Sequence, residues 1–196
     1  ARAGGEVNHS SRYLSEVSKL VKLIKADEIE KMAQALCDLR DNRGGRLFFL
    51  GLGGSAANAS HAVNDFRKLC NIEAYAPTDN VAELTAIAND GGRERIFITW
   101  LKESNAFHYD ALFILSVGGG TDTVSVPLKP ALSMAGARRM TVFGIVGRDG
   151  GYTKKMGDHV IVIPTVNKKH ITPHTEAFQS VILHCLVSHP LLQKNP

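Results

Sequence analysis

The sequence predicts an α/β fold of three layers, in which helices cover both faces of a doubly wound, mostly parallel sheet and further helices precede it. Short runs of consecutive apolar residues alternate along the chain with segments of helical periodicity. Strands that are apolar on both sides are typical of a parallel sheet covered on both faces. The 196 residues suffice for one such domain, residues 1–196, with neither a linker nor an internal repeat.

The first elements are helical. After a tail over residues 1–9, a helix is predicted to begin near Ser10 or Ser11, because apolar residues follow at spacings of three and four as far as Ile24. Asp27 and Glu30 have the spacing of a capping box for a second helix, which ends at the turn 41–45.

Strands and helices then alternate. The predicted strands cover residues 46–50, 110–116, 140–146 and 160–164, and helices are predicted over residues 56–69, after residue 121, and over residues 175–188. The intervening segment predicts a short strand at residues 75–76 and a helix over residues 81–88. This alternation is that of a parallel sheet with helical crossovers.

Composition excludes several classes of protein. The net charge is +4, but the basic residues are dispersed, so we expect no nucleic-acid partner. No apolar run approaches the roughly 18 residues of a membrane span. Three widely spaced cysteines predict free thiols in a reducing compartment, and no apolar leader is evident, so we expect a cytoplasmic protein.

Two glycine-rich turns follow predicted strands, at Gly51–Ser55 and Ser116–Thr121. Ligands of a doubly wound sheet bind at the carboxyl ends of the strands, where glycine admits close approach and the next helix offers free N–H groups. Ser55 is placed to cap that helix or to contact an anion. Glycine also serves tight turns for structural reasons alone, and neither turn has the pattern of a P-loop or a dinucleotide site.

Four side chains are candidates for chemistry. His61 and Asp65 lie four residues apart on a predicted helix, so they share one face, either as a metal or acid–base pair or as a surface ion pair. Glu176 and His184 lie about 12 Å apart along the final helix, too far to bind one ion from one straight helix. They serve different sites, or they belong to an active site built from two subunits. The alternative is a solvated Glu and a partly buried His without a role in catalysis.

These residues resemble a known family. Gly51–Ala56, followed by His61 and Asp65, resembles the GNGGSA…H…E signature of bacterial phosphoheptose isomerases, which belong to the sugar isomerase (SIS) family. Further segments match in order over nearly the whole chain: residues 88–90 with its AND segment, 116–121 with its STSGNS phosphate loop, 147–151 with its GKDGG turn, and Glu176 and His184 with a Gln and a His.

The resemblance implies a phosphorylated sugar substrate, zinc or another divalent metal, and no organic cofactor. The implied sugar and phosphate contacts are Gly53, Gly54, Ser55, Asn89, Asp90, Ser116, Gly118, Gly119, Gly120 and Thr121, and the implied metal ligands are His61, Asp65, Glu176 and His184. It also implies a homotetramer with active sites between subunits, in which the helical region 1–45 packs, and a place in heptose biosynthesis.

The implied reaction converts sedoheptulose 7-phosphate to D-glycero-D-manno-heptose 7-phosphate through an enediol, with Asp65, His184 and Glu176 as catalytic residues. Departures from the family pattern indicate a divergent branch. Leu52 replaces Asn in the first loop, and Val117, Gly118 and Gly120 replace Thr, Ser and Asn in the phosphate loop. Asp65 replaces Glu, and Glu176 replaces Gln. Two alternatives stay open, an isomerase of another long-chain ketose phosphate and a non-catalytic SIS protein that binds a protein partner.

Overall fold

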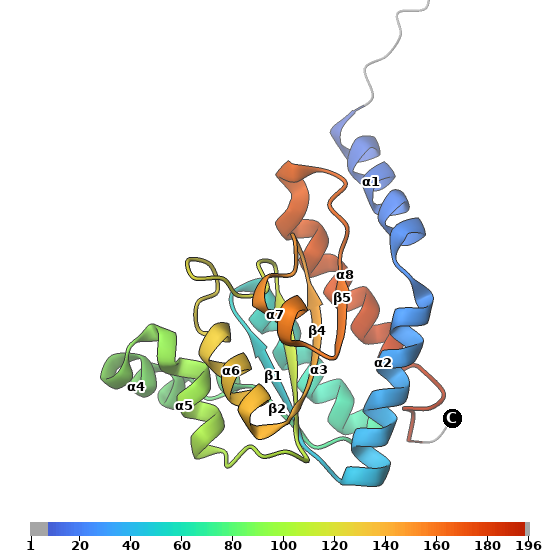
Figure 1. Ribbon diagram of the computed structural model, residues 1–196. Helices are drawn as coiled ribbons and strands as arrows, with labels where there is room; N and C mark the ends of the chain where they lie inside the picture. Colours follow the sequence, from blue (N-terminus) through green and yellow to red (C-terminus); the bar gives the residue numbers. More distant parts are fainter. Residues whose placement is uncertain (1–7, 195–196) are drawn as a thin grey trace, which may run out of the picture.

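The computed structural model describes residues 8–194, and a five-stranded sheet forms its centre (Figure 1). The strands are β1 (Leu47–Gly51), β2 (Ala74–Tyr75), β3 (Ala111–Ser116), β4 (Thr141–Val146) and β5 (His159–Val162). Their order is β2-β1-β3-β4-β5, and every neighbouring pair is parallel. The predicted parallel sheet is therefore confirmed, including its short second strand.

Helices cover both faces of this sheet. They are α1 (His9–Leu23), α2 (Ala26–Asp38), α3 (Gly54–Cys70), α4 (Val81–Gly91), α5 (Ile96–Glu103), α6 (Leu128–Arg138), α7 (Gly151–Met156) and α8 (Ile171–Val187), with the short π-helix η1 (Leu39–Arg43) and the short 3₁₀ helices η2 (Pro77–Asp79), η3 (Arg93–Arg95) and η4 (Lys168–His170). One core lies between the sheet and α1, α2, α3 and α8, and a second lies between the sheet and α4, α5 and α6. Figure 1 shows these two groups on opposite sides of the strands, which is the predicted three-layer arrangement. Among residues 8–194, no helix has the length and apolar character needed to cross a bilayer.

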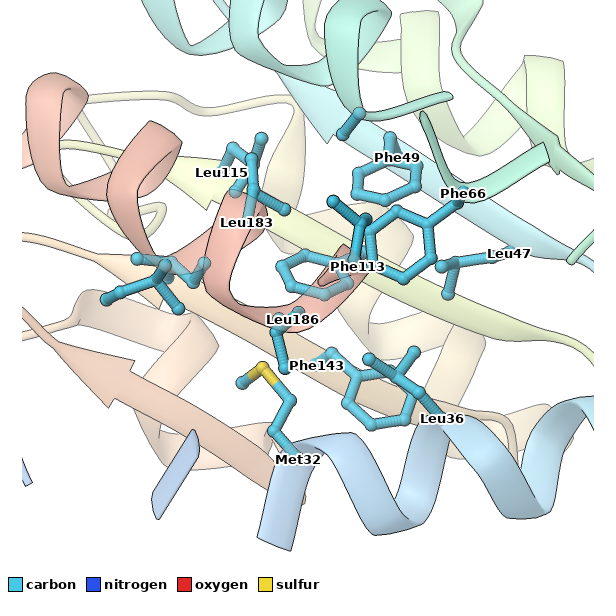
Figure 2. Packing of buried hydrophobic residues seen from close by; sticks show 14 of the residues in the cluster. Met32, Leu36, Leu47, Phe49, Phe66, Phe113, Leu115, Phe143, Leu183 and Leu186 are labelled. Atoms are coloured by element: carbon cyan, nitrogen blue, oxygen red, sulfur yellow. The ribbon is translucent and has the colours of Figure 1, made fainter. Parts of the chain in front are cut away.

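Aromatic residues hold the first core together (Figure 2). Phe49, Phe113 and Phe143 stand side by side on β1, β3 and β4, with ring centroids 4.9 Å and 5.9 Å apart along the row. Each is fully buried or nearly so, and burying one such side chain contributes about 1.5–3 kcal/mol. Leu36 of α2 and Leu186 of α8 pack on the same cluster, which fixes these helices against the sheet.

The starts of the first two helices differ from the sequence prediction. Helix α1 begins at His9, because the Asn8 side chain accepts a hydrogen bond from the Ser11 N–H at 2.9 Å. The expected tail is thus helical at residue 9, and its residues 1–7 lie outside the described part of the chain. The capping box at Asp27 is wrong. Helix α2 starts at Ala26, two residues before the start that a cap at Asp27 predicts, and Asp27 lies in its first turn, where the helix dipole favours a carboxylate.

Sequence periodicity also missed two helices, α5 and α7. The apolar run at the start of α5 is too short to separate helix from strand by pattern. Helix α7 begins at Gly151, a residue of the turn that follows β4, and it has only six residues. The helix expected directly after Thr121 begins later, at Leu128, so β3 and α6 are joined by the long loop 117–127.

Candidate functional site

The strand order places both glycine-rich turns at one point of the sheet. Strands β1 and β3 are neighbours, with Gly51 paired to Leu115, yet β1 leads to α3 on one face and β3 leads to α6 on the other. This is the topological switch point of a doubly wound sheet, where a crevice opens at the carboxyl ends of the strands. The two turns predicted from sequence follow these two strands.

Three side chains converge where α3 packs against α8. His61 Nε2 lies 3.2 Å from Asp65 Oδ2, and His184 Nε2 lies 3.8 Å from the same oxygen. The two imidazole rings are 5.0 Å apart, and one ligand atom from each residue lies within 4.8 Å of the others. Both histidines are about half exposed, whereas Asp65 is mostly buried. Two imidazoles and a carboxylate can hold a divalent ion or exchange protons.

A polar seam fixes the register of the two helices that carry this group. The Asn58 amide donates to the Glu176 carbonyl and to Gln179 Oε1, both at 2.9 Å, and Ser180 donates to Asn58 Oδ1 at 3.0 Å. The fully buried Gln179 donates in turn to the Ser55 hydroxyl at 3.1 Å. Sequence reasoning missed this seam, although polar residues on an otherwise apolar helix face are a signal for it.

Glu176 lies apart from the three converging residues. Its carboxylate rests against Gly54 at the start of α3, where a Cβ atom on Gly54 would lie 2.5 Å from Glu176 Oε2. The eight residues between Glu176 and His184 separate them along α8 as the sequence predicts, so the four expected metal ligands are not gathered in one chain. The carboxylate instead occupies the amino end of α3, where a negative charge is favoured.

The first glycine turn is shaped by Gly53, which has φ 62° and ψ −130° and precedes α3 as its N-cap. The expectation that Ser55 caps α3 is therefore wrong. Ser55 lies inside the first turn of the helix, is 1% exposed, and accepts the hydrogen bond from Gln179. Its contact with a sugar stays a prediction.

The second glycine turn is packed against the turn after β4. Gly119 has φ 66°, and a Cβ atom there would lie 2.0 Å from the Gly150 carbonyl oxygen. The Gly119 N–H donates to Ser116 Oγ at 3.0 Å, and its carbonyl accepts from the backbone N–H and hydroxyl of Thr153 at 2.9 Å and 2.7 Å. Glycine at 119 is thus required for structure, whatever its role toward a ligand.

Thr121 shapes the loop that follows. Its hydroxyl accepts hydrogen bonds from the Thr123 N–H at 3.2 Å and the Val124 N–H at 2.8 Å. These bonds close a turn of the kind that threonine hydroxyls form with nearby backbone. Because of this turn, α6 begins only at Leu128. The Thr121 hydroxyl, which the family resemblance assigns to phosphate, already accepts two backbone hydrogen bonds.

The remaining predicted contacts, Asn89 and Asp90, lie at the end of α4. The Asn89 amide donates to Asp90 Oδ1 at 2.8 Å, and Asp90 lines a cavity of about 620 Å³. Residues of α4, η3 and α5 form its walls, while His61, Asp65 and His184 line a different, much smaller hollow. Within one chain, the structure does not bring these two groups to a common cavity.

Comparisons with known proteins identify relatives of this chain. No protein-family model matches the chain. A phosphoheptose isomerase of Trichlorobacter lovleyi is 32% identical over 148 residues, which are 73% of this chain and 71% of that protein. Phosphoheptose isomerase 1 of Campylobacter jejuni is 29% identical over 194 residues, covering 95% of this chain and 96% of its own length.

A solved structure agrees in fold. The phosphoheptose isomerase GmhA of Neisseria gonorrhoeae matches with a TM-score of 0.77 over 91% of this chain and 92% of its own, at 24% identity. The parallel sheet, the paired glycine turns and the relatives lead to one conclusion: the chain belongs to the phosphoheptose isomerase family of the SIS fold and is a sugar-phosphate isomerase.

Proposed function

We propose that this isomerase interconverts sedoheptulose 7-phosphate and D-glycero-D-manno-heptose 7-phosphate through an enediol. The names of its relatives support a heptose phosphate as substrate. The observation that carries the proposal is the convergence of His61, Asp65 and His184 on two helices, one of which begins at the first glycine turn. This set combines a base, an acid and a possible metal site, which are the groups that enediol chemistry uses.

The donor set suits a divalent ion such as zinc, because two imidazole nitrogens and a carboxylate oxygen lie within 4.8 Å of one another. We assign His61, Asp65 and His184 as its ligands. When bound, the ion supplies Lewis acidity that stabilises negative charge on a substrate oxygen. Glu176 joins this set only where neighbouring subunits share a site, and within one chain we assign its carboxylate to the sugar hydroxyls near Gly54.

The proton path uses Asp65 and His184. The Asp65 carboxylate takes a proton from C1 of the ketose, while His184, in the site without a bound ion, gives a proton to the carbonyl oxygen on C2, which forms the enediol; where an ion is bound, its Lewis acidity would stabilise that oxygen instead. The C1 hydroxyl then returns a proton to His184, and Asp65 delivers its proton to C2, which yields the aldose. Every proton that leaves a protein group is thereby restored to it.

The substrate contacts follow the glycine turns. We assign Gly53, Gly54 and Ser55 to the sugar and the loop from Ser116 through Gly118, Gly119 and Gly120 to Thr121 to the phosphate, mainly through backbone N–H groups. Asn89 and Asp90 are assigned to sugar hydroxyls. Because Asp90 lines a separate cavity within one chain, this last assignment requires a site completed by a neighbouring subunit.

Exposed apolar residues on α1 support such an assembly. Leu14, Val21 and Leu23 are 66%, 61% and 54% exposed, which is unusual for three large apolar side chains of one helix. We propose that α1 packs against other subunits in a homotetramer whose active sites lie between chains.

Two substitutions test the catalytic assignment. Asp65→Asn keeps the shape of the side chain but cannot accept the proton, so turnover should fall by about 10²–10⁴ with little change in substrate affinity. Glu176→Gln should reduce turnover less, because the amide still hydrogen bonds to a hydroxyl. Glu28→Gln on α2, whose side chain contacts exposed Lys25, is the matched control.

The outcomes separate the alternatives. A larger loss in Glu176→Gln than in Asp65→Asn would transfer the role of base to Glu176. Full activity of both variants would refute the assignment of both carboxylates. Faster turnover of another long-chain ketose phosphate in a competition assay would keep the chemistry and replace the proposed substrate.

A further inference from the structure

A second cluster of metal-binding side chains lies where α1 packs against the start of α8, outside the group of His61, Asp65 and His184. His170 Nδ1 and His174 Nε2 each lie 2.7 Å from the same carboxylate oxygen, Glu16 Oε2. One ligand atom from each of the three residues lies within 4.8 Å of the others. We propose that Glu16, His170 and His174 form a second divalent-metal site that fastens α1 to α8.

The chemistry of the three donors suits zinc or a similar ion. Two histidines and one glutamate are a known zinc ligand set in which the remaining position is left open. His170 and His174 are four residues apart, so they lie on one face of the chain as it enters α8, and Glu16 faces them from α1. The three ligands therefore come from α1 and from the continuous η4–α8 segment, which a bound ion would join.

Surrounding residues hold the donors in place. The Asn167 amide donates to Glu16 Oε1 at 2.7 Å, which orients the carboxylate. The Tyr13 ring lies 4.6 Å from that of His174 and 5.3 Å from that of His170.

The site is open on one side. His170 is 24% exposed, and the exposed ring of His9 lies 5.9 Å from it. Water can therefore complete the coordination of an ion bound there. His174, by contrast, is only 3% exposed and forms the closed side.

The buried Nδ1 atom of His174 limits the expected affinity. Within residues 8–194, no other buried side-chain nitrogen or oxygen lacks a hydrogen-bond partner. A metal on Nε2 places the ring proton on Nδ1, where histidine ligands normally donate to a second group. Loss of such a partner typically lowers metal affinity about 10–100-fold, so we expect a weaker site than one with a complete outer shell.

Metal stoichiometry tests the proposal. Co²⁺ would be titrated into the metal-free full chain and followed by its visible absorption, and Zn²⁺ by calorimetry. We expect two equivalents per chain for the natural protein. The variant His61→Asn/His184→Asn should retain one equivalent, and Glu16→Gln/His170→Asn should lose the weaker one.

The first of these variants keeps the test decisive, because His61 and His184 are half exposed and their replacement should leave the fold intact. If that variant binds no metal, or if Glu16→Gln/His170→Asn still binds two equivalents, the second site is refuted. If the His61→Asn/His184→Asn variant binds one equivalent of metal, and this ion raises its melting temperature, the second site is supported. Because this readout is metal binding, it is independent of the proposed isomerase reaction.

Discussion

At the start of α3, the Glu176 carboxylate occupies the space that a side chain at position 54 would need. A methyl group at position 54 would lie 2.5 Å from Glu176 Oε2, so Gly54→Ala must displace that carboxylate from the glycine turn. We expect turnover to fall at least about tenfold, because misplacement of a functional group by about 1 Å is costly in catalysis. Steady-state kinetics measure the effect.

Gly136→Ala is the matched control for that substitution. Gly136 also lies in a helix, but its nearest neighbour to an added Cβ is Met156 Cε at 3.8 Å. Alanine there should keep activity and stabilise the helix by about 1 kcal/mol. Wild-type turnover in Gly54→Ala would contradict the placement of Glu176.

At this scale, sequence spacing predicted the approach of His61 to Asp65, because residues four apart on a helix share a face. The distance of His184 from Asp65 depends instead on how α3 packs on α8, which needs the folded chain and, here, the family resemblance. The roles of these residues stay predictions. The cluster around Glu16 was not predicted, because Glu16 lies some 150 residues from His170 and His174 in the chain.

Among the elements, β3 is anchored at its start by a buried ion pair. Asp110 is fully buried and accepts from the Arg46 guanidinium at 2.9 Å, the Arg46 N–H at 2.9 Å and the Phe107 N–H at 2.9 Å. Asp110→Ala leaves all these donors without their acceptor and should lower the free energy of unfolding by about 3–5 kcal/mol. Urea denaturation measures the loss.

The exposed pair of Lys25 and Glu28 provides the comparison, with a side-chain N–O distance of 3.5 Å. Glu28→Ala should cost about 0–1 kcal/mol. Equal losses in the two variants would show that the Asp110 pair does not anchor the strand.

Asp41, in the middle of η1, makes stability depend on pH. Its carboxylate accepts from Arg40 at 2.6 Å and from the Cys37 thiol at 3.1 Å, and these bonds lower the pKa of Asp41 to about 2. The folded pKa lies below the unfolded value, so this contribution is complete above about pH 4 and is lost as pH falls toward 2.

Asp41→Asn should therefore unfold at lower urea than the natural protein at pH 7, and the difference should shrink as the pH falls from about 4 toward 2. A difference that stays constant over that range would contradict the assignment.

Elements whose residues are buried on both sides were predictable, since β1 and β3 are apolar throughout and buried at every position. Elements that depend on a turn were not. The start of α6 is set by the hydroxyl of Thr121 and the turn after it, and that of α7 by Gly150 with φ 84°. Such starts depend on local hydrogen bonds and backbone angles that hydrophobic periodicity does not encode.

For the whole molecule, the exposed apolar face of α1 predicts assembly. Replacing Leu14 and Val21 by glutamate places charge on the proposed interface, so sedimentation should show smaller species than the natural protein. Val81→Glu on α4, at a position 70% exposed, is the matched control and should leave the assembly unchanged. An unchanged mass for the α1 variant would place the interface elsewhere.

Formation of aldose from sedoheptulose 7-phosphate, followed by NMR with and without a chelator, examines the reaction and the metal site in one assay. We expect product that disappears with chelator and returns with zinc, because His61, Asp65 and His184 supply the ligands of the ion. Turnover indifferent to chelator would refute the metal and keep the isomerase. No product from this or any other ketose phosphate would contradict the proposed reaction and favour a SIS protein that binds a partner.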